Sequence, residues 1–223
     1  LKTYKVFFKY LQQEGYRDDD ISADIPLVKS EQKMLPTFTK QQVLQLLNQP
    51  NQKTFVGLRD YTMMMVFLET GIRIQELVDL QMDDVVFKEN ELRIRMGKGR
   101  KTRRVPFQKT CSNVLKIYLR ERGELHTKAL FVTLDNRSLN KRTVQENIQE
   151  YGKKAGLCGV RVSPHTFRHT MAKFYLLNGG DAFSLQQILG HSSLDMVKLY
   201  VHLFRSDIQE QHRKYSPVEN IKF

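Results

Sequence analysis

The sequence has few cysteines and no long apolar segment, and both shortages exclude classes of protein. Only two cysteines, Cys111 and Cys158, occur among its 223 residues. They provide neither a disulfide framework nor a zinc-ligand spacing, so the sequence fits a reducing cytosol. The longest apolar stretch, near residues 61–68, is far too short to span a bilayer. Disulfide-rich secreted proteins and helical membrane proteins are therefore excluded.

Negative charge is also scarce relative to positive charge. Thirty-six Lys and Arg residues against 24 Asp and Glu residues leave a formal net charge of +12 at pH 7. Hydrophobic residues make up 40% of the chain and charged residues 27%, which is typical of a globular domain and not of a disordered chain. A partner rich in phosphate is the leading interpretation of this charge, and an anionic membrane surface is the second.

Hydrophobic periodicity predicts two parts of unequal length. Apolar residues follow helical spacing in residues 3–11, whereas residues 21–36 contain two prolines and show no clear period. We expect residues 1–34 to form a helix plus a linker, in the C-terminal part of a longer protein. Residues 35–223 are expected to form one domain, with a C-terminal tail from about residue 203.

From residue 35 onward, the patterns predict a mainly α fold with a small antiparallel β-sheet (α+β). Alternating apolar and basic residues predict strands at 91–96 and 102–107, and a third strand is expected at 85–87. Capping boxes are expected at Thr39 with Gln42 and at Ser184 with Gln187. The expected helices follow Thr39 and lie at 59–70, 74–80, 112–122, 140–155, 165–177, 184–190 and 194–204, with a final one from 206.

Basic residues cluster around the expected turn between the two longer strands. Seven basic residues and no acidic residue lie between positions 93 and 104. Such a cluster repels itself, so an acidic partner explains it better than protection of a sheet edge does. Lys98 differs from the others because it lies between two glycines at the turn. The other six are predicted DNA or RNA contacts: Arg93, Arg95, Arg100, Lys101, Arg103 and Arg104.

A second feature combines a histidine and an arginine at a helix start. Ser163 and Pro164 are an N-cap and a first-turn proline, and His165 and Arg168 follow on one face of the helix. Free amides, an imidazole and a guanidinium favour a phosphate and can move a proton. In the alternative, His165 caps the helix and Arg168 pairs with a carboxylate. His169 is expected to pack or bond within the fold, because no further metal ligands accompany it.

Three further residues lie at helix junctions or within a helix. Arg73 follows the helix stop predicted at Gly71, and its alternative role is an ion pair with Glu76. His191 follows another helix-ending glycine, where it either faces a cleft or caps the helix. Tyr200 lies within an apolar helix, where a core position is the ordinary interpretation of a tyrosine.

Together these motifs resemble the tyrosine recombinase (phage-type integrase) family, in its Xer-like branch. The matching segments are TGIRIQEL at 70–77, GKGRKTRRVP at 97–106, HTFRH at 165–169, LGHSS at 189–193 and Tyr200. The successive spacings are 3 residues from His165 to Arg168, 23 from Arg168 to His191 and 9 from His191 to Tyr200. Five separated motifs occur in the family's order, and the similarity covers about residues 35–215.

The resemblance implies a site-specific DNA recombinase or integrase that cuts and rejoins strands through a 3′-phosphotyrosine. Tyr200 would attack the phosphodiester, Arg73 and Arg168 would hold its non-bridging oxygens, and Lys98 would protonate the leaving 5′-oxygen. Of the two histidines in the set, the first would assist proton transfer at the tyrosine and the second would hydrogen-bond the phosphate. The implied catalytic set is Arg73, Lys98, His165, Arg168, His191 and Tyr200.

The resemblance also implies partners and an organisation. These are double-stranded DNA with specific recombination sites, a homo-tetramer on that DNA and accessory DNA-bending proteins, with no membrane, metal or cofactor. The implied role is integration or excision of a mobile element in the bacterial cytoplasm, at the nucleoid. Residues 1–34 would be a remnant of a core-binding domain. The alternatives are DNA relaxation like that of a type IB topoisomerase and a non-catalytic DNA-binding protein on the same scaffold.

Overall fold

The chain divides into two units of very different size, Leu1–Met34 and Leu35–Phe223. The computed structural model describes residues 1–26, 36–95, 102–190, 200–201, 212–213, 216 and 218. Lys98, Arg100, Lys101 and His191 lie outside the described residues. Of the helix expected at 194–204, the described part is Tyr200 and Val201, both of which are helical.

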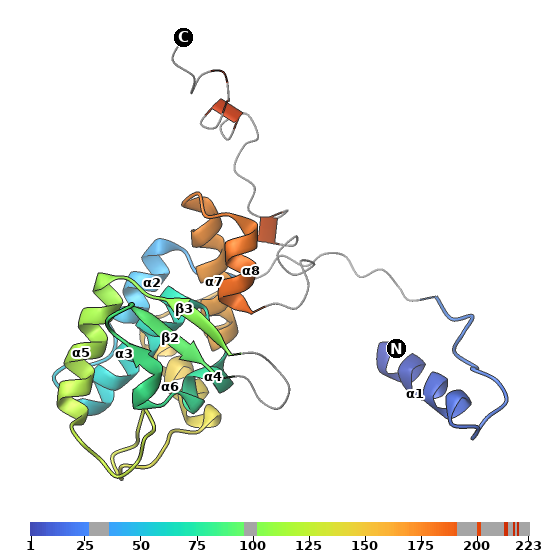
Figure 1. The fold of residues 1–223 in the computed structure, drawn as a ribbon, viewed down its shortest axis with the longest axis horizontal. Helices are drawn as coiled ribbons and strands as arrows, with labels where there is room; N and C mark the ends of the chain where they lie inside the picture. The colour runs from blue at the N-terminus through green and yellow to red at the C-terminus, as the bar shows by residue number, and fades with distance from the viewer. Residues whose placement is uncertain are drawn as a thin grey trace. The chain divides into compact units, whose positions relative to one another are not determined.

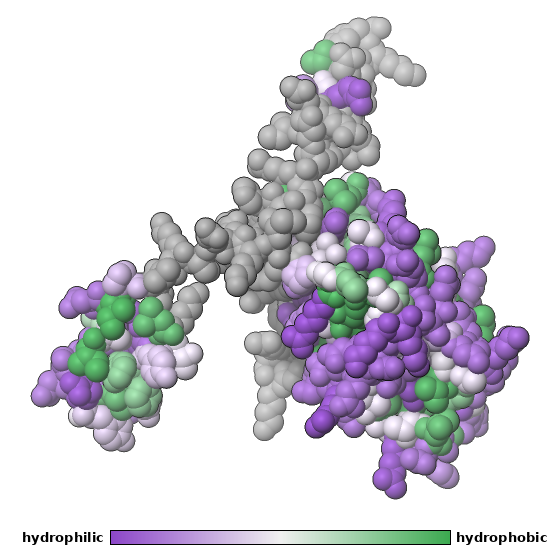
Figure 2. Space-filling model, turned by 180° about the vertical axis from the view of Figure 1, so that it is seen from behind, coloured by the Kyte–Doolittle hydropathy of each residue, from purple (hydrophilic) through white to green (hydrophobic). Residues whose placement is uncertain are grey.

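Within residues 1–26, the smaller unit contains the helix α1 (Lys2–Gln13), where periodicity predicts a helix. Several large apolar side chains of this helix remain exposed to solvent, and Figure 2 shows them beside hydrophilic ones. They are Tyr4, Val6, Phe7 and Tyr10. A helix with an exposed apolar face is suited to pack against another surface.

The larger unit is mainly helical, which confirms the prediction (Figure 1). Its helix α3 is central, because it packs against α5 and α7 and also contacts α2 and α6. Helix α3 is apolar on most of its circumference, as a helix surrounded by others must be. The helices are α2 (Lys40–Leu47), α3 (Phe55–Thr70), α4 (Ile74–Asp79), α5 (Lys109–Arg122), α6 (Lys141–Lys154), α7 (Pro164–Leu177) and α8 (Ala182–Leu189). No helix of the described part is long and apolar enough to cross a membrane.

A three-stranded antiparallel sheet of order β1-β2-β3 confirms the predicted hairpin and third strand. The strands are β1 (Val85–Val86), which follows the short 3₁₀ helix η1 (Met82–Asp84), β2 (Glu91–Ile94) and β3 (Arg103–Pro106). Leu92 pairs with Val105 and both are buried, whereas Arg93 pairs with Arg104 and both are exposed. The sheet therefore has one face in the core and one basic face in solvent.

Several helix ends form as their sequence signals predict. Thr39 and Gln42 form a complete capping box at the start of α2. The Ser163 hydroxyl accepts a hydrogen bond from the Thr166 amide at the start of α7, where Pro164 occupies the first turn. These local signals succeed because each cap depends only on residues within one turn.

Three predicted helix starts are wrong. Helix α5 begins at Lys109, three residues earlier than the predicted start at 112. Helix α3 begins at Phe55, four residues earlier than predicted, because the Thr54 side chain caps it. Helix α8 begins at Ala182, because the Asp181 carboxylate accepts the amides of Phe183 and Ser184. The capping box predicted at Ser184 is therefore absent.

A small apolar cluster between α7 and α8 holds Tyr200 against the domain. Tyr200 is only 1% exposed, and it packs with Met171 and Ala172 of α7 and with Leu185 and Leu189 of α8. Burying a leucine side chain contributes roughly 1.5–3 kcal/mol. This packing brings Tyr200 to the same end of α7 that carries the sequence motif with His165 and Arg168.

Candidate active site

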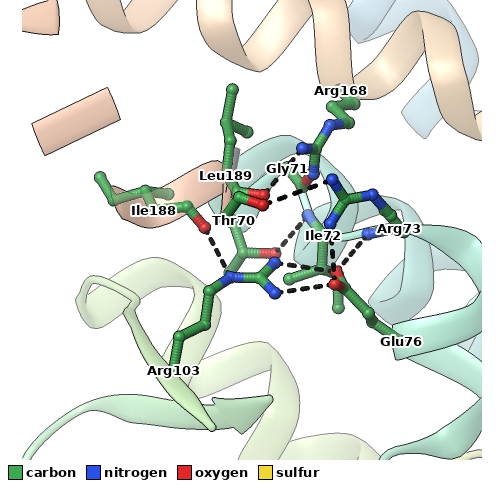
Figure 3. A network of polar contacts seen from close by, with 10 residues as sticks. Thr70, Gly71, Ile72, Arg73, Glu76, Arg103, Arg168, Ile188 and Leu189 are labelled. Carbon is green, nitrogen blue, oxygen red and sulfur yellow. Dashed lines mark hydrogen bonds and ion pairs between the residues drawn. The ribbon is translucent and has the colours of Figure 1, made fainter. Parts of the chain in front are cut away.

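Three arginines from three separate elements gather around one carboxylate (Figure 3). Arg103 at the start of β3 makes a forked ion pair with Glu76 of α4, with N···O distances of 2.7 and 2.8 Å. Arg73 donates its backbone N–H to Glu76 at 2.7 Å and its guanidinium at 3.1 Å. Arg168 approaches from α7 on the far side of Arg73. One carboxylate among three guanidiniums leaves an excess of positive charge, which favours an anion.

Arg168 joins the ends of two helices. Its guanidinium donates to the carbonyl oxygen of Gly71, after α3, at 2.6 Å and to that of Leu189, at the end of α8, at 2.8 Å. Carbonyls at helix C-termini carry partial negative charge and lack helical partners, so they suit a buried cation. Burial, and then the charge of Arg73, lower the pKa of Arg168 to about 10. The guanidinium therefore remains charged at pH 7.

Two glycines make this close approach of elements possible. Gly71 has a φ of 59° and Gly190 a φ of 63°, in the left-handed region. A Cβ atom on Gly71 would lie 2.8 Å from the Leu189 side chain, and one on Gly190 would lie 2.9 Å from the Arg103 guanidinium. Both turns therefore require glycine where they meet the arginine cluster.

Glu76 is the electrostatic centre of the cluster. Burial would raise the pKa of its carboxyl, but hydrogen bonds from Arg103 and from the Arg73 amide, together with both positive charges, lower that pKa below its ordinary value. The ion pair named above as an alternative role for Arg73 is thus present. Because the Arg73 side chain is still 40% exposed, it faces solvent as well as Glu76.

Tyr200 makes its hydrogen bond with a histidine to which the motif analysis gave only a structural role. The Tyr200 hydroxyl lies 2.6 Å from Nδ1 of His169. Burial first, and then the charges of His165 and Arg168, lower the pKa of His169 to about 4. The imidazole is therefore neutral at pH 7 and can accept a hydrogen bond. Burial raises the pKa of Tyr200 although Arg168 opposes this, so the phenol is protonated as well.

The structure thus brings part of the predicted catalytic set together. Arg73, Arg168 and Tyr200 lie at one end of α7 and α8, and His165 is exposed on the first turn of α7. Lys98 and His191 lie outside the described residues. Within those residues, no group of three or more His, Cys, Asp and Glu side chains is suited to hold a metal ion.

The arginines that the structure describes between positions 93 and 104 differ in their surroundings. Arg93 and Arg104 lie opposite each other on the exposed face, and Arg104 also lies 3.4 Å from Glu91. Arg95 folds back to Asp84 at 2.8 Å, with its side chain 53% exposed.

Arg103 departs from its predicted role as a nucleic-acid contact. Its side chain is 12% exposed, and its Nε donates to the carbonyl oxygen of Ile188 in addition to the fork with Glu76. The physical reason is the alternation of the strand. Arg103 pairs with Ile94 and shares the core-facing side with Val105, two residues later.

The sequence is similar to that of a known protein family over most of its length. Residues 36–206 match the model of the phage integrase family. The chain is 32% identical to tyrosine recombinase XerD of Staphylococcus epidermidis over 222 residues, which cover 97% of this chain and 75% of that protein. It is 30% identical to tyrosine recombinase XerC of Thermodesulfovibrio yellowstonii, over 98% of this chain and 74% of that protein.

Solved structures give the same result at the level of the fold. The crystal structure of XerA recombinase matches with a TM-score of 0.70 at 30% identity, over 97% of this chain and 74% of that chain. The Tn1549 transposon integrase matches with a TM-score of 0.73 at 18% identity, over 97% and 76% of the two chains, which shows the fold alone. The chain therefore belongs to the phage integrase family and is a tyrosine-type site-specific recombinase.

Proposed function

We propose that the chain cuts and rejoins double-stranded DNA at specific sites by forming a 3′-phosphotyrosine on Tyr200. The observation that carries the proposal is the position of the Tyr200 hydroxyl, which lies against His169 of α7 and near Arg168 of the arginine cluster around Glu76. A nucleophile beside an excess of guanidinium charge suits attack on a phosphodiester. The phosphotyrosine conserves the energy of the ester bond, so that religation needs no nucleotide.

The two arginines of the proposed set would act on the transition state. Negative charge grows on the non-bridging oxygens as Tyr200 attacks, and planar guanidiniums bind such oxygens in pairs. Arg168 is held by two carbonyl oxygens and Arg73 by Glu76, so both are oriented before DNA arrives. Preorganised donors of this kind typically contribute 10²–10³-fold each.

Lys98 is proposed to protonate the leaving 5′-oxygen. Replacing Lys98 with Ala is expected to slow cleavage of ordinary DNA by about 10²–10⁴-fold, the usual contribution of a general acid. A duplex with sulfur at the 5′-bridging position should restore the rate, because a thiolate leaves without a proton. Rates of adduct formation under single-turnover conditions test this, and Lys101→Ala is measured beside Lys98→Ala because Lys101 is the other candidate acid. A rate that sulfur does not restore would mean that Lys98 only positions DNA, or that Lys101 is the acid.

The exposed face of the β2–β3 hairpin is proposed to contact DNA phosphates. Arg93 and Arg104 are cross-strand partners, and like charges placed directly opposite each other destabilise a sheet. An anionic partner would offset that repulsion.

The salt dependence of DNA binding tests whether Arg93 and Arg104 contact phosphates. The double substitution of Arg93 and Arg104 by Ser is expected to weaken binding to all duplexes and to reduce the slope of log K against log salt by ~0.9 per lost phosphate contact. Arg142→Ser on α6, where the side chain is 86% exposed, is the matched control and should leave the slope unchanged. An equal slope for the wild type and the double variant would mean that these arginines protect the sheet edge and do not contact phosphates.

The assembly and the biological role are further parts of the proposal. We propose a homo-tetramer on DNA, assisted by DNA-bending proteins, and we assign α1 to a core-binding domain because its apolar face is exposed. The proposed task is integration or excision of a mobile element. Sequencing the DNA around the gene tests it: paired repeats that bound a mobile unit support it, and an invariant chromosomal site without such repeats contradicts it.

A further inference from the structure

Arg168 and His169 are adjacent residues of α7, and they face the arginine cluster and the Tyr200 hydroxyl, respectively. Arg168 is fixed by the carbonyl oxygens of Gly71 and Leu189, and His169 directs Nδ1 at the Tyr200 hydroxyl, 2.6 Å away. The His169 and Tyr200 rings are tilted by 51°, with their centroids 5.7 Å apart. A rigid helix thus holds an imidazole at the nucleophilic oxygen and a guanidinium next to it.

The phenol must lose its proton during the reaction. Tyr200 is 1% exposed and neutral, so water has little access to take that proton. As the bond from the phenolic oxygen to phosphorus forms, the oxygen loses its basicity and the proton must move to a base. A neutral imidazole nitrogen at hydrogen-bond distance meets the geometric requirement for that base.

We propose that His169 is a catalytic residue that accepts the Tyr200 proton when the strand is cut and returns it when the strand is rejoined. In the forward step the Oη–P bond forms, the P–O5′ bond breaks, the phenolic proton moves to Nδ1 of His169, and the 5′-oxygen takes a proton from Lys98. Religation reverses each transfer. This inference rests on the proposed function, because it assigns a base to the same nucleophile.

Charge in the site fits this sequence of events. Burial first, and then the charges of His165 and Arg168, disfavour an imidazolium at His169 in the free protein, which keeps the base available. A phosphodiester bound at Arg168 brings negative charge that offsets this effect. His165, the residue that the family resemblance names for proton transfer, is exposed and lies one helical turn before His169.

The first experiment tests whether His169 takes the proton of Tyr200 or only positions its hydroxyl. Asn places an oxygen close to the position of Nδ1, so His169→Asn keeps an acceptor for the Tyr200 hydroxyl but cannot take its proton. His126→Asn, at an exposed histidine in the loop after α5 and outside the proposed site, is the matched control. The substrate is a nicked duplex that the wild-type chain captures covalently from a random-sequence pool. We expect His169→Asn to bind this duplex normally, to keep its thermal midpoint and to form adduct about 10²–10⁴-fold more slowly.

The second experiment asks whether the lost function is that of a base. Replacing Tyr200 with 2,3-difluorotyrosine makes the phenol more acidic, so a fluorinated His169→Asn chain should regain cleavage as the pH rises. The same replacement in an otherwise wild-type chain should have little effect. Cleavage by His169→Asn at the wild-type rate, or a loss that fluorination leaves unchanged, overturns the inference.

A third measurement needs no DNA. With 3-fluorotyrosine at position 200, the ¹⁹F resonance of the free protein should move in His169→Ala and stay in place in His165→Asn. An unmoved resonance in His169→Ala means that the contact does not exist in solution, which overturns the inference. A wild-type chain that captures no duplex at all refutes the proposed function itself, whereas a loss confined to the His169 variant concerns only the base.

Discussion

Replacing Tyr200 with Phe is expected to abolish the covalent adduct with DNA. The substitution removes only the hydroxyl, and without it the chain has no oxygen at this position to attack phosphorus. Removal of an enzyme's nucleophile lowers the rate on the order of 10⁶-fold. DNA binding should persist, because the arginine cluster around Glu76 does not depend on this hydroxyl. Denaturing gels of protein mixed with a nicked duplex measure the adduct.

Tyr175→Phe provides the matched control for that result. Tyr175 is a residue of α7, and its hydroxyl lies 2.7 Å from the hydroxyl of Ser184. Each substitution therefore removes a hydroxyl that takes part in hydrogen bonding, and a typical hydrogen bond contributes about 1 kcal/mol to the free energy of unfolding. Only Tyr200→Phe should lose the adduct. A Tyr200→Phe chain that still becomes linked to a 3′-phosphate would mean that another residue is the nucleophile.

Replacing Glu76 with Gln is expected to destabilise the domain and to weaken catalysis together. The Glu76 side chain is 10% exposed and that of Arg103 is 12% exposed, so their ion pair is largely buried. Removing one partner of a buried pair typically costs about 3–5 kcal/mol, because the other charge remains without compensation. Arg73 also loses the carboxylate that orients it, for which we expect a further loss of cleavage of about 10²-fold.

The acid dependence of stability gives this prediction a second measurement. The pKa of Glu76 is lower in the folded protein than its ordinary value of 4.5. Its contribution is therefore complete above the unfolded pKa and is lost as the pH falls through the lower folded pKa. Wild type should lose stability over that acidic range more steeply than Glu76→Gln does.

An exposed ion pair serves as the control for Glu76. Glu146 pairs with Arg142 on α6, and the two side chains are 59% and 86% exposed. Surface pairs contribute little, so Glu146→Gln should unfold at the wild-type denaturant concentration. If Glu76→Gln also unfolds there, the cluster around Glu76 does not stabilise the domain.

The sequence by itself determined features that depend on neighbouring residues. The capping box at Thr39 and the N-cap at Ser163 formed as predicted, because each involves residues within one turn. Alternation placed Leu92 in the core and Arg93 in solvent, because side chains of a strand alternate between its faces. The same alternation applied to Val105 would also have placed Arg103 on the buried face, so that signal was present and overlooked.

Only the tertiary structure decided which distant groups meet. His169 and Tyr200 are 31 residues apart, Arg103 and Glu76 are 27 apart, and Arg168 and the Gly71 carbonyl are 97 apart. No periodicity or cap relates such positions, because these contacts depend on how α3, α7, α8 and β3 pack around two glycine turns. The motifs thus determined which residue types were available for chemistry. Packing decided that one arginine is buried against Glu76 and that the histidine beside the Tyr200 hydroxyl is His169.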